Sequence, residues 1–180
     1  MQNRPVGHPA AGNWTLIDRK FACDFQREGC RGFVLFDSKL MAMARRAADT
    51  EGLDPAVVCA VVEQESNWNT WAMRYEPQFF GKYVAPLYTN NKVGATEAYA
   101  RGFSWGLMQV MGQTAREMGV NSLHLSTLCD PAVGLAVGCK VLRKKLENAG
   151  GDLRKGLLAW NGGGNPDYAD EVMGRMSKYR

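Results

Sequence analysis

The sequence of 180 residues contains no run of about 18 apolar residues, the length that a helix needs to cross a membrane. Its first stretch, MQNRPVGHPAAGNWTLIDRKF, also lacks the apolar core of a secretory signal peptide. We therefore expect no transmembrane segment, no signal peptide and no integral association with a membrane.

Metal-ligand patterns are missing as well. The five cysteines form no CxxC pair, and the two histidines, His8 and His124, stand alone. The GGG at 162–164 lacks the Lys-Ser/Thr of a phosphate-binding loop. We expect no metal and no other cofactor.

The cysteines themselves leave two readings open. Cys59 and Cys139 lie in helix-like runs, where cysteine is typically a buried thiol. Cys23 and Cys30 flank a short polar loop and could form a disulfide, whereas the remaining thiols favour a reducing compartment.

The excess of positive over negative charge is small. The formal net charge is +4, from 22 basic and 18 acidic residues. This excess is far below that of a dedicated nucleic-acid-binding protein, so we expect no nucleic-acid partner. No strongly basic amphipathic helix favours a membrane-active protein either. With 46% apolar and 22% charged residues, the composition is that of an ordinary globular protein.

Helical patterns dominate from Ser38 onward, and alternating strand patterns are nearly absent, which predicts a mainly α domain over 38–180. Residues 1–37 show no clean period, and we expect an irregular N-terminal arm packed on the domain. Between residues 67 and 104 the chain is aromatic and loop-rich, with short helices expected over 76–84 and 95–101. The other predicted helices are 38–52, 54–66, one or two short ones ending at Gly119, 130–148, 153–160 and 167–178.

The apolar run VVCAVVEQES ends in two carboxylates, Glu63 and Glu65. On a helix, Val58, Val61, Val62 and Glu65 have the spacing of one face, so Glu65 continues the apolar stripe. A carboxyl held against an apolar surface has a raised pKa and keeps its proton near neutral pH, as a general acid requires. Glu63 points toward the polar side, and we expect it to be solvated.

Four short blocks then stand in order along the chain. They are Glu65-Ser66 with Trp68-Asn69 and Ala72, Gly106-Leu107-Met108-Gln109 with Thr114-Ala115, Asp130-Pro131 with Gly138 and Leu142, and Ala159-Trp160-Asn161-Gly162-Gly163. Together they resemble the ES-x-F-N-P-x-A, GLMQ…TA, DP…G..L and A-Y-N-G motifs of the family 1 soluble lytic transglycosylases. The resemblance covers roughly residues 53–165.

The resemblance implies a compact α+β lysozyme-like domain with a loop-rich insert between the glutamate and GLMQ blocks. It implies an enzyme that cleaves the MurNAc-β-1,4-GlcNAc bond of peptidoglycan and leaves 1,6-anhydroMurNAc ends, with Glu65 as single general acid and base. Such an enzyme acts on glycan strands at the bacterial cell wall, in the periplasm or outside the cell. We expect a monomer, and a phage-type endolysin is one form that fits.

Seven further residues are expected at the substrate site. They are Ser66, Glu76, Ser104, Met108, Gln109, Trp160 and Asn161. Gln109 can both donate and accept hydrogen bonds to sugar groups. Met108 can line a sugar face or belong to the core. Ser66 can orient a carboxyl or cap backbone, and Asn161 can meet substrate or order its glycine-rich turn. Gly106 allows close backbone approach.

Two departures from the family pattern leave alternatives open. Where the family has a tyrosine that contacts the catalytic glutamate, this chain has Trp160, so Tyr75, Tyr99 or Tyr168 could supply the hydroxyl instead. Glu76, in an Arg-Tyr-Glu-Pro element, is structural if it pairs with a nearby cation.

If Glu76 instead faces Glu65, it could activate water, as in a goose-lysozyme-type hydrolysing muramidase. A non-catalytic wall-binding protein is a third possibility, against which the intact Glu65 argues. The aromatic residues of the insert belong more often to a core than to a sugar platform, although one or two can still stack on glycan rings. They are Trp71, Tyr75, Phe79, Phe80, Tyr83 and Tyr88.

Overall fold

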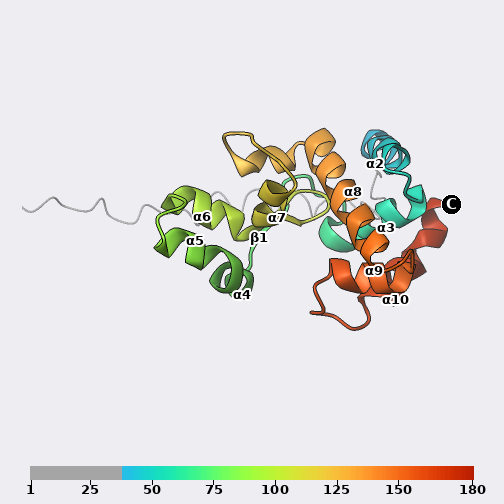
Figure 1. Cartoon of the computed structure of the whole chain (residues 1–180). Helices are drawn as coiled ribbons and strands as arrows, with labels where there is room; N and C mark the ends of the chain where they lie inside the picture. The colour runs from blue at the N-terminus through green and yellow to red at the C-terminus, as the bar shows by residue number, and fades with distance from the viewer. Residues whose placement is uncertain (1–37) are drawn as a thin grey trace, which may run out of the picture. The chain divides into compact units, whose positions relative to one another are not determined.

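The computed structural model describes residues 38–180, which form a mainly helical unit, as predicted (Figure 1). The predicted N-terminal arm, and with it Cys23 and Cys30, lies outside the described residues. The longer elements are α2 (Ser38–Thr50), α3 (Pro55–Ser66), α8 (Pro131–Asn148), α9 (Leu153–Trp160), α10 (Tyr168–Arg175) and the 3-10 helix η3 (Met176–Tyr179). None of the helices described over 38–180 is both long and apolar enough to cross a membrane.

Helix α3 is the centre of the core. Asp54 caps it by accepting a 2.8 Å hydrogen bond from the amide of Ala56, and Pro55 takes the first helical position. The helix ends at Asn67, whose φ of 48° is left-handed. Every residue from 56 to 62 is buried, so α3 is enclosed by other helices on more than one face.

Helix α8 packs closely because it carries glycine. Asp130 caps its start, and a Cβ on Gly134 would lie 2.4 Å from the carbonyl oxygen of Leu128. A Cβ on Gly138 would lie 2.4 Å from the sulfur of Met108. Both glycines therefore allow the close approach of neighbouring segments, and neither meets the groove described below.

The α+β domain that the resemblance implies has a small antiparallel sheet, whose strands the sequence patterns did not locate. Its strands are β1 (Met73–Tyr75), β2 (Phe103–Trp105) and β3 (Val110–Met111), in the order β1-β2-β3. Arg74 of β1 pairs with Ser104 of β2 in the register. Strands of two or three residues are too short to show an alternating pattern, which is why the sequence does not indicate them.

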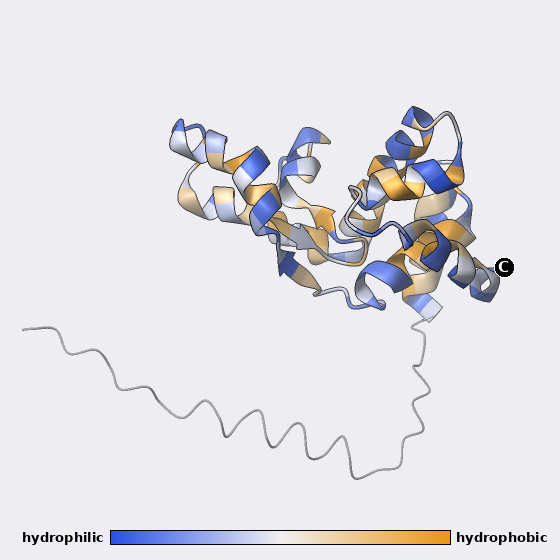
Figure 2. Cartoon of the chain, turned by 90° about the horizontal axis from the view of Figure 1, so that it is seen from below, coloured by the Kyte–Doolittle hydropathy of each residue, from blue (hydrophilic) through white to orange (hydrophobic). Residues whose placement is uncertain are grey.

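The segment between β1 and β2 folds into short helices, drawn in green in Figure 1. They are α4 (Pro77–Phe79), the π-helical turn η1 (Phe80–Val84), α5 (Ala85–Thr89) and α6 (Ala95–Arg101). The helices predicted over 76–84 and 95–101 are therefore confirmed, while α5 was not predicted. In Figure 2 the apolar residues, in orange, gather mostly where helices and strands face one another.

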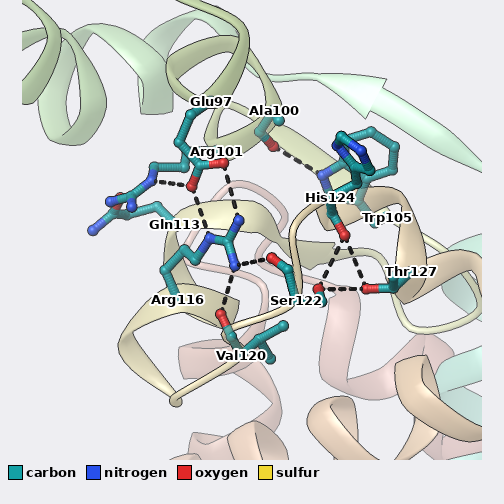
Figure 3. A network of polar contacts seen from close by, with 10 residues as sticks. All are labelled: Glu97, Ala100, Arg101, Trp105, Gln113, Arg116, Val120, Ser122, His124 and Thr127. Carbon is teal, nitrogen blue, oxygen red and sulfur yellow. Dashed lines mark hydrogen bonds and ion pairs between the residues drawn. The ribbon is translucent and has the colours of Figure 1, made fainter. Parts of the chain in front are cut away.

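A network of ion pairs joins α6 to α7 (Gly112–Glu117) and to the loop that leads into η2 (Leu125–Cys129) (Figure 3). Glu97 accepts hydrogen bonds from Arg101 at 2.7 Å and from Arg116 at 2.7 and 3.0 Å. Arg116 also donates to the carbonyl oxygens of Val120 and Ser122. The Arg116 hydrogen bonds hold the pKa of Glu97 below its usual range, so the network is charged at neutral pH.

Candidate active site

A groove of about 630 Å³ runs between the sheet, α4, η1 and α7 on one side and α8, α9 and the following loop on the other. Glu65 from the end of α3 lines it. Five of the seven other predicted site residues line the same groove, namely Glu76, Ser104, Gln109, Trp160 and Asn161. The folded chain thus brings together residues that are up to 96 positions apart in the sequence (161 − 65).

The carboxyl group of Glu65 is held by two donors on one oxygen. The indole nitrogen of Trp160 donates to Oε1 at 2.9 Å, and the hydroxyl of Tyr168 donates to the same oxygen at 2.5 Å. Among the described residues no donor lies on Oε2. Because Glu65 lines the groove, Oε2 is the oxygen left for a ligand there.

Burial raises the pKa of Glu65 above its ordinary value. The hydrogen bonds from Tyr168 and Trp160 act in the opposite direction, because they stabilise the carboxylate, but they do not cancel the effect of burial. Arg74 lowers this pKa and Glu76 raises it through their charges. The net result is the raised pKa that the apolar helix face predicts, and it suits a proton donor.

Tyr168, the first residue of α10, was only one of three candidate hydroxyl donors in the sequence. It is buried, with 3% of its surface exposed, and contacts Glu65 directly. Tyr75 and Tyr99 instead pack ring to ring, with centroids 6.2 Å apart. Sequence spacing could not select among the three tyrosines, because the choice depends on where α10 packs.

The expectation that Glu63 is solvated is wrong. Only 14% of its side chain is exposed, and its two oxygens accept hydrogen bonds from Lys178 and Tyr179, each at 2.6 Å. Burial acts to raise the pKa of Glu63, but these hydrogen bonds and the nearby charges of Lys178 and Arg175 lower it overall. The partners come from the C-terminal end of the chain, so the helix pattern alone gave no sign of them.

Glu76 lies in the groove as one half of an ion pair. Arg74 Nε is 2.5 Å from Glu76 Oε1, and both side chains line the groove. Tyr75, the residue between Arg74 and Glu76, packs its ring against Phe103 of β2. The pairing with Arg74 is the arrangement expected of a structural or substrate-binding Glu76.

Gln109 is fixed by its own chain. Its φ of 46° is left-handed, and its amide nitrogen donates to the carbonyl oxygens of Ala72 and Gly106, each at 2.9 Å. Its amide oxygen accepts from the Ser104 hydroxyl at 2.9 Å. The side chains of Ser104 and Gln109 are therefore held by hydrogen bonds where they line the groove.

Ser66 and Met108 do not line the groove. The Ser66 hydroxyl is within hydrogen-bond distance of the carbonyl oxygens of Leu107, at 2.8 Å, and Val62, at 3.1 Å, so it ties α3 to the GLMQ segment. Met108 is fully buried and packs against Gly138. Of the two alternatives for Met108, the structure favours the core, which corrects its assignment as a sugar wall.

Asn161 is the C-cap of α9 and lines the groove. Its amide nitrogen donates to the carbonyl oxygen of Asn165 at 3.3 Å, across a turn in which Gly162 and Gly163 have positive φ. Asn161 thus orders the glycine-rich turn and still faces the groove. Over residues 38–180, no group of three or more His, Cys, Asp or Glu side chains could hold a metal ion.

Comparisons with known proteins give a family and one relative for this chain. The family described as Transglycosylase SLT domain matches residues 42–172. A protein named Transglycosylase from Enterobacteria phage PRD1 is 33% identical over 113 residues, which is 63% of this chain and 31% of the phage protein. The matched part is therefore less than a third of that relative. No solved structure matches.

Proposed function

The chain belongs to the Transglycosylase SLT domain family, and on that basis we propose that it is a peptidoglycan lytic transglycosylase. The observation that carries the proposal is Glu65, a groove-lining carboxyl with a raised pKa and one oxygen free of protein donors among the described residues. The proposed substrate is the glycan strand of peptidoglycan, and the proposed place of action is the bacterial cell wall. The phage relative favours a phage-type enzyme.

In the proposed reaction, Oε2 of Glu65 gives its proton to the oxygen of the MurNAc-β-1,4-GlcNAc bond, and the bond from that oxygen to the anomeric carbon breaks. The C6 hydroxyl of the same MurNAc then attacks the anomeric carbon, and Glu65 takes up the hydroxyl proton. The products are a free GlcNAc end and a 1,6-anhydroMurNAc end. No water is consumed, and Glu65 returns to its starting state.

Tyr168 and Trp160 have a role between the two proton transfers. Glu65 is then a half-buried carboxylate, and the two donors on Oε1 stabilise its charge. Because both donors are on the same oxygen, they also fix the direction of Oε2. The second transfer therefore uses the same oxygen as the first without a rotation of the carboxyl group.

A hydrolysing muramidase is the second candidate, because Glu76 lines the same groove. A water-activating base must be free to accept a proton. Glu76 Oε1 is already occupied by Arg74 Nε, at 2.5 Å, and this ion pair favours the transglycosylase.

The test is to digest purified peptidoglycan and identify the new ends by mass spectrometry. We expect 1,6-anhydroMurNAc ends from the wild type and from Glu76→Gln, and none from Glu65→Gln. Glu63→Gln, on the same helix, is the matched control and should still cleave. Reducing MurNAc ends that disappear in Glu76→Gln would establish the muramidase instead. A folded wild type that binds peptidoglycan without cleaving it would point to the wall-binding protein.

A further inference from the structure

Two aromatic side chains of the insert line the groove that contains Glu65. Phe79 at the end of α4 and Tyr83 in η1 both line the groove, and so does Gln78 beside them. Their ring centroids are 4.8 Å apart at an interplanar angle of 47°. Tyr83 is 48% exposed, which is a large aromatic surface to leave in water.

The packing of the insert does not account for this pair. Its own aromatic cluster consists of Tyr75, Phe80, Tyr99 and Phe103, whose rings are joined by contacts of 5.3–6.2 Å between centroids. Among the described residues, the ring contact of Phe79 and Tyr83 is with each other and not with that cluster. A core role would place these rings inside the cluster.

The local backbone presents the two rings together. Positions four apart share a helix face, and the π-helical turn η1 begins directly after Phe79. The ammonium of Lys82 lies over the Tyr83 ring, 4.9 Å from its centroid, where a cation attracts the ring face. Phe79 and Tyr83 therefore form one aromatic surface in the groove that also contains Glu65.

We propose that Phe79 and Tyr83 form a subsite that stacks on one amino-sugar ring of a long glycan strand, away from the bond that is cleaved. The proposal rests on the proposed function. A pyranose ring offers an apolar face of C–H groups to an aromatic ring, while its N-acetyl group needs polar partners. The Gln78 amide, next to the pair, can both donate to and accept from such a group.

The location in the insert has a consequence for substrate length. The insert lies between Glu65 and Gly106 in the sequence. Phe79 and Tyr83 are the aromatic residues of the insert that line the groove. A strand too short to reach them gains nothing from their presence. The subsite therefore distinguishes long glycan strands from short fragments rather than accelerating the chemical step.

The test measures binding in a Glu65→Gln background, so that no strand is cleaved. The probes are peptide-free peptidoglycan glycans of four and of twelve sugars, titrated by calorimetry. We expect Phe79→Ala combined with Tyr83→Ala to weaken the affinity for the twelve-sugar strand by roughly tenfold or more, and that for the four-sugar strand by less than about twofold. Tyr83→Phe should retain the affinity, because it keeps the ring.

Tyr88→Ala is the matched control, since Tyr88 is a similarly exposed tyrosine, at 44%, in the same insert and outside the groove. It should leave both affinities unchanged. An unchanged affinity of the folded double variant for the longer strand, or an equal loss for both lengths, would overturn the subsite. Hydrolytic ends from the wild type would overturn the transglycosylase and leave this binding result standing, so the two proposals fail separately.

Discussion

Replacing Tyr168 by phenylalanine is expected to move the alkaline limb of the activity profile to higher pH. The substitution removes the hydroxyl that donates to Glu65 Oε1 at 2.5 Å and keeps the buried ring. That hydrogen bond favours the carboxylate, so it lowers a pKa that burial has raised. Without it, Glu65 keeps its proton to a higher pH. Because the proposed first step needs the protonated form, activity persists further into the alkaline range.

The size of the shift follows from the strength of one hydrogen bond to a charged group. Such a bond contributes about 1.5 kcal/mol at the lower end of its range. One pKa unit corresponds to about 1.4 kcal/mol, so the alkaline limb should move by roughly one pH unit. Trp160 still donates to the same oxygen, which is why we take the lower end. The maximal rate should fall, because the second step loses a group that stabilises the carboxylate.

The assay is kcat/KM against pH on purified peptidoglycan at constant ionic strength. Tyr179→Phe is the matched control, because Tyr179 donates to the other glutamate of the same helix, Glu63, at 2.6 Å. It should leave the limb in place. A limb that stays in place or moves to lower pH in folded Tyr168→Phe would refute the assignment of Glu65 as the acid that this hydroxyl tunes.

Three further outcomes are expected. Trp160→Phe removes the 2.9 Å donor to Glu65 and should move the alkaline limb in the same direction by less than Tyr168→Phe does, measured in the same assay. Glu65→Gln should raise Tm by a few degrees at pH 7, because a carboxyl with a raised folded-state pKa destabilises the fold when charged; the difference should shrink as the pH falls through that pKa, and a lower Tm at pH 7 would contradict it. Gly106→Ala should lower the free energy of unfolding by roughly 3 kcal/mol or more, because φ is +68° and the new Cβ would lie 2.2 Å from the carbonyl oxygen of Leu128. Gly52→Ala, with φ of +66° and open space around it, should lower the free energy of unfolding by only about 1–2 kcal/mol. Denaturant titration of both variants measures the difference.

Local signals in the sequence predicted most of the helical fold. The two Asp-Pro pairs marked the starts of α3 and α8, and in each the aspartate caps the helix as expected. The apolar stripe that ends at Glu65 predicted a carboxyl whose pKa is raised by burial. These features depend on neighbours within one or two helical turns, which is the range over which a pattern can be read.

What the sequence missed depends on contacts between distant segments. Met108 and Gln109 are adjacent in one motif, yet one is buried in the core and the other lines the groove. Tyr168 became the hydroxyl partner of Glu65 because α10 packs beside α3, 103 positions along the chain. The pairing of Glu76 with Arg74 is local, but its position in the groove is set by the sheet, whose strands are too short to predict.

The two glutamates at the end of α3 show how one helix assigns opposite roles to identical side chains. Both are largely removed from water, and each receives a tyrosine hydroxyl from the C-terminal part of the chain. Glu63 also receives the ammonium of Lys178, and this hydrogen bond, that of Tyr179 and the charges of Lys178 and Arg175 together lower its pKa although burial acts to raise it. Glu65 receives only neutral donors, so burial prevails and its pKa is raised. Glu63 thus differs from Glu65 in having two cations, Lys178 and Arg175, in ion-pair contact with its carboxylate. A cation placed on Glu65 would lower its pKa and remove the property that the proposed chemistry requires.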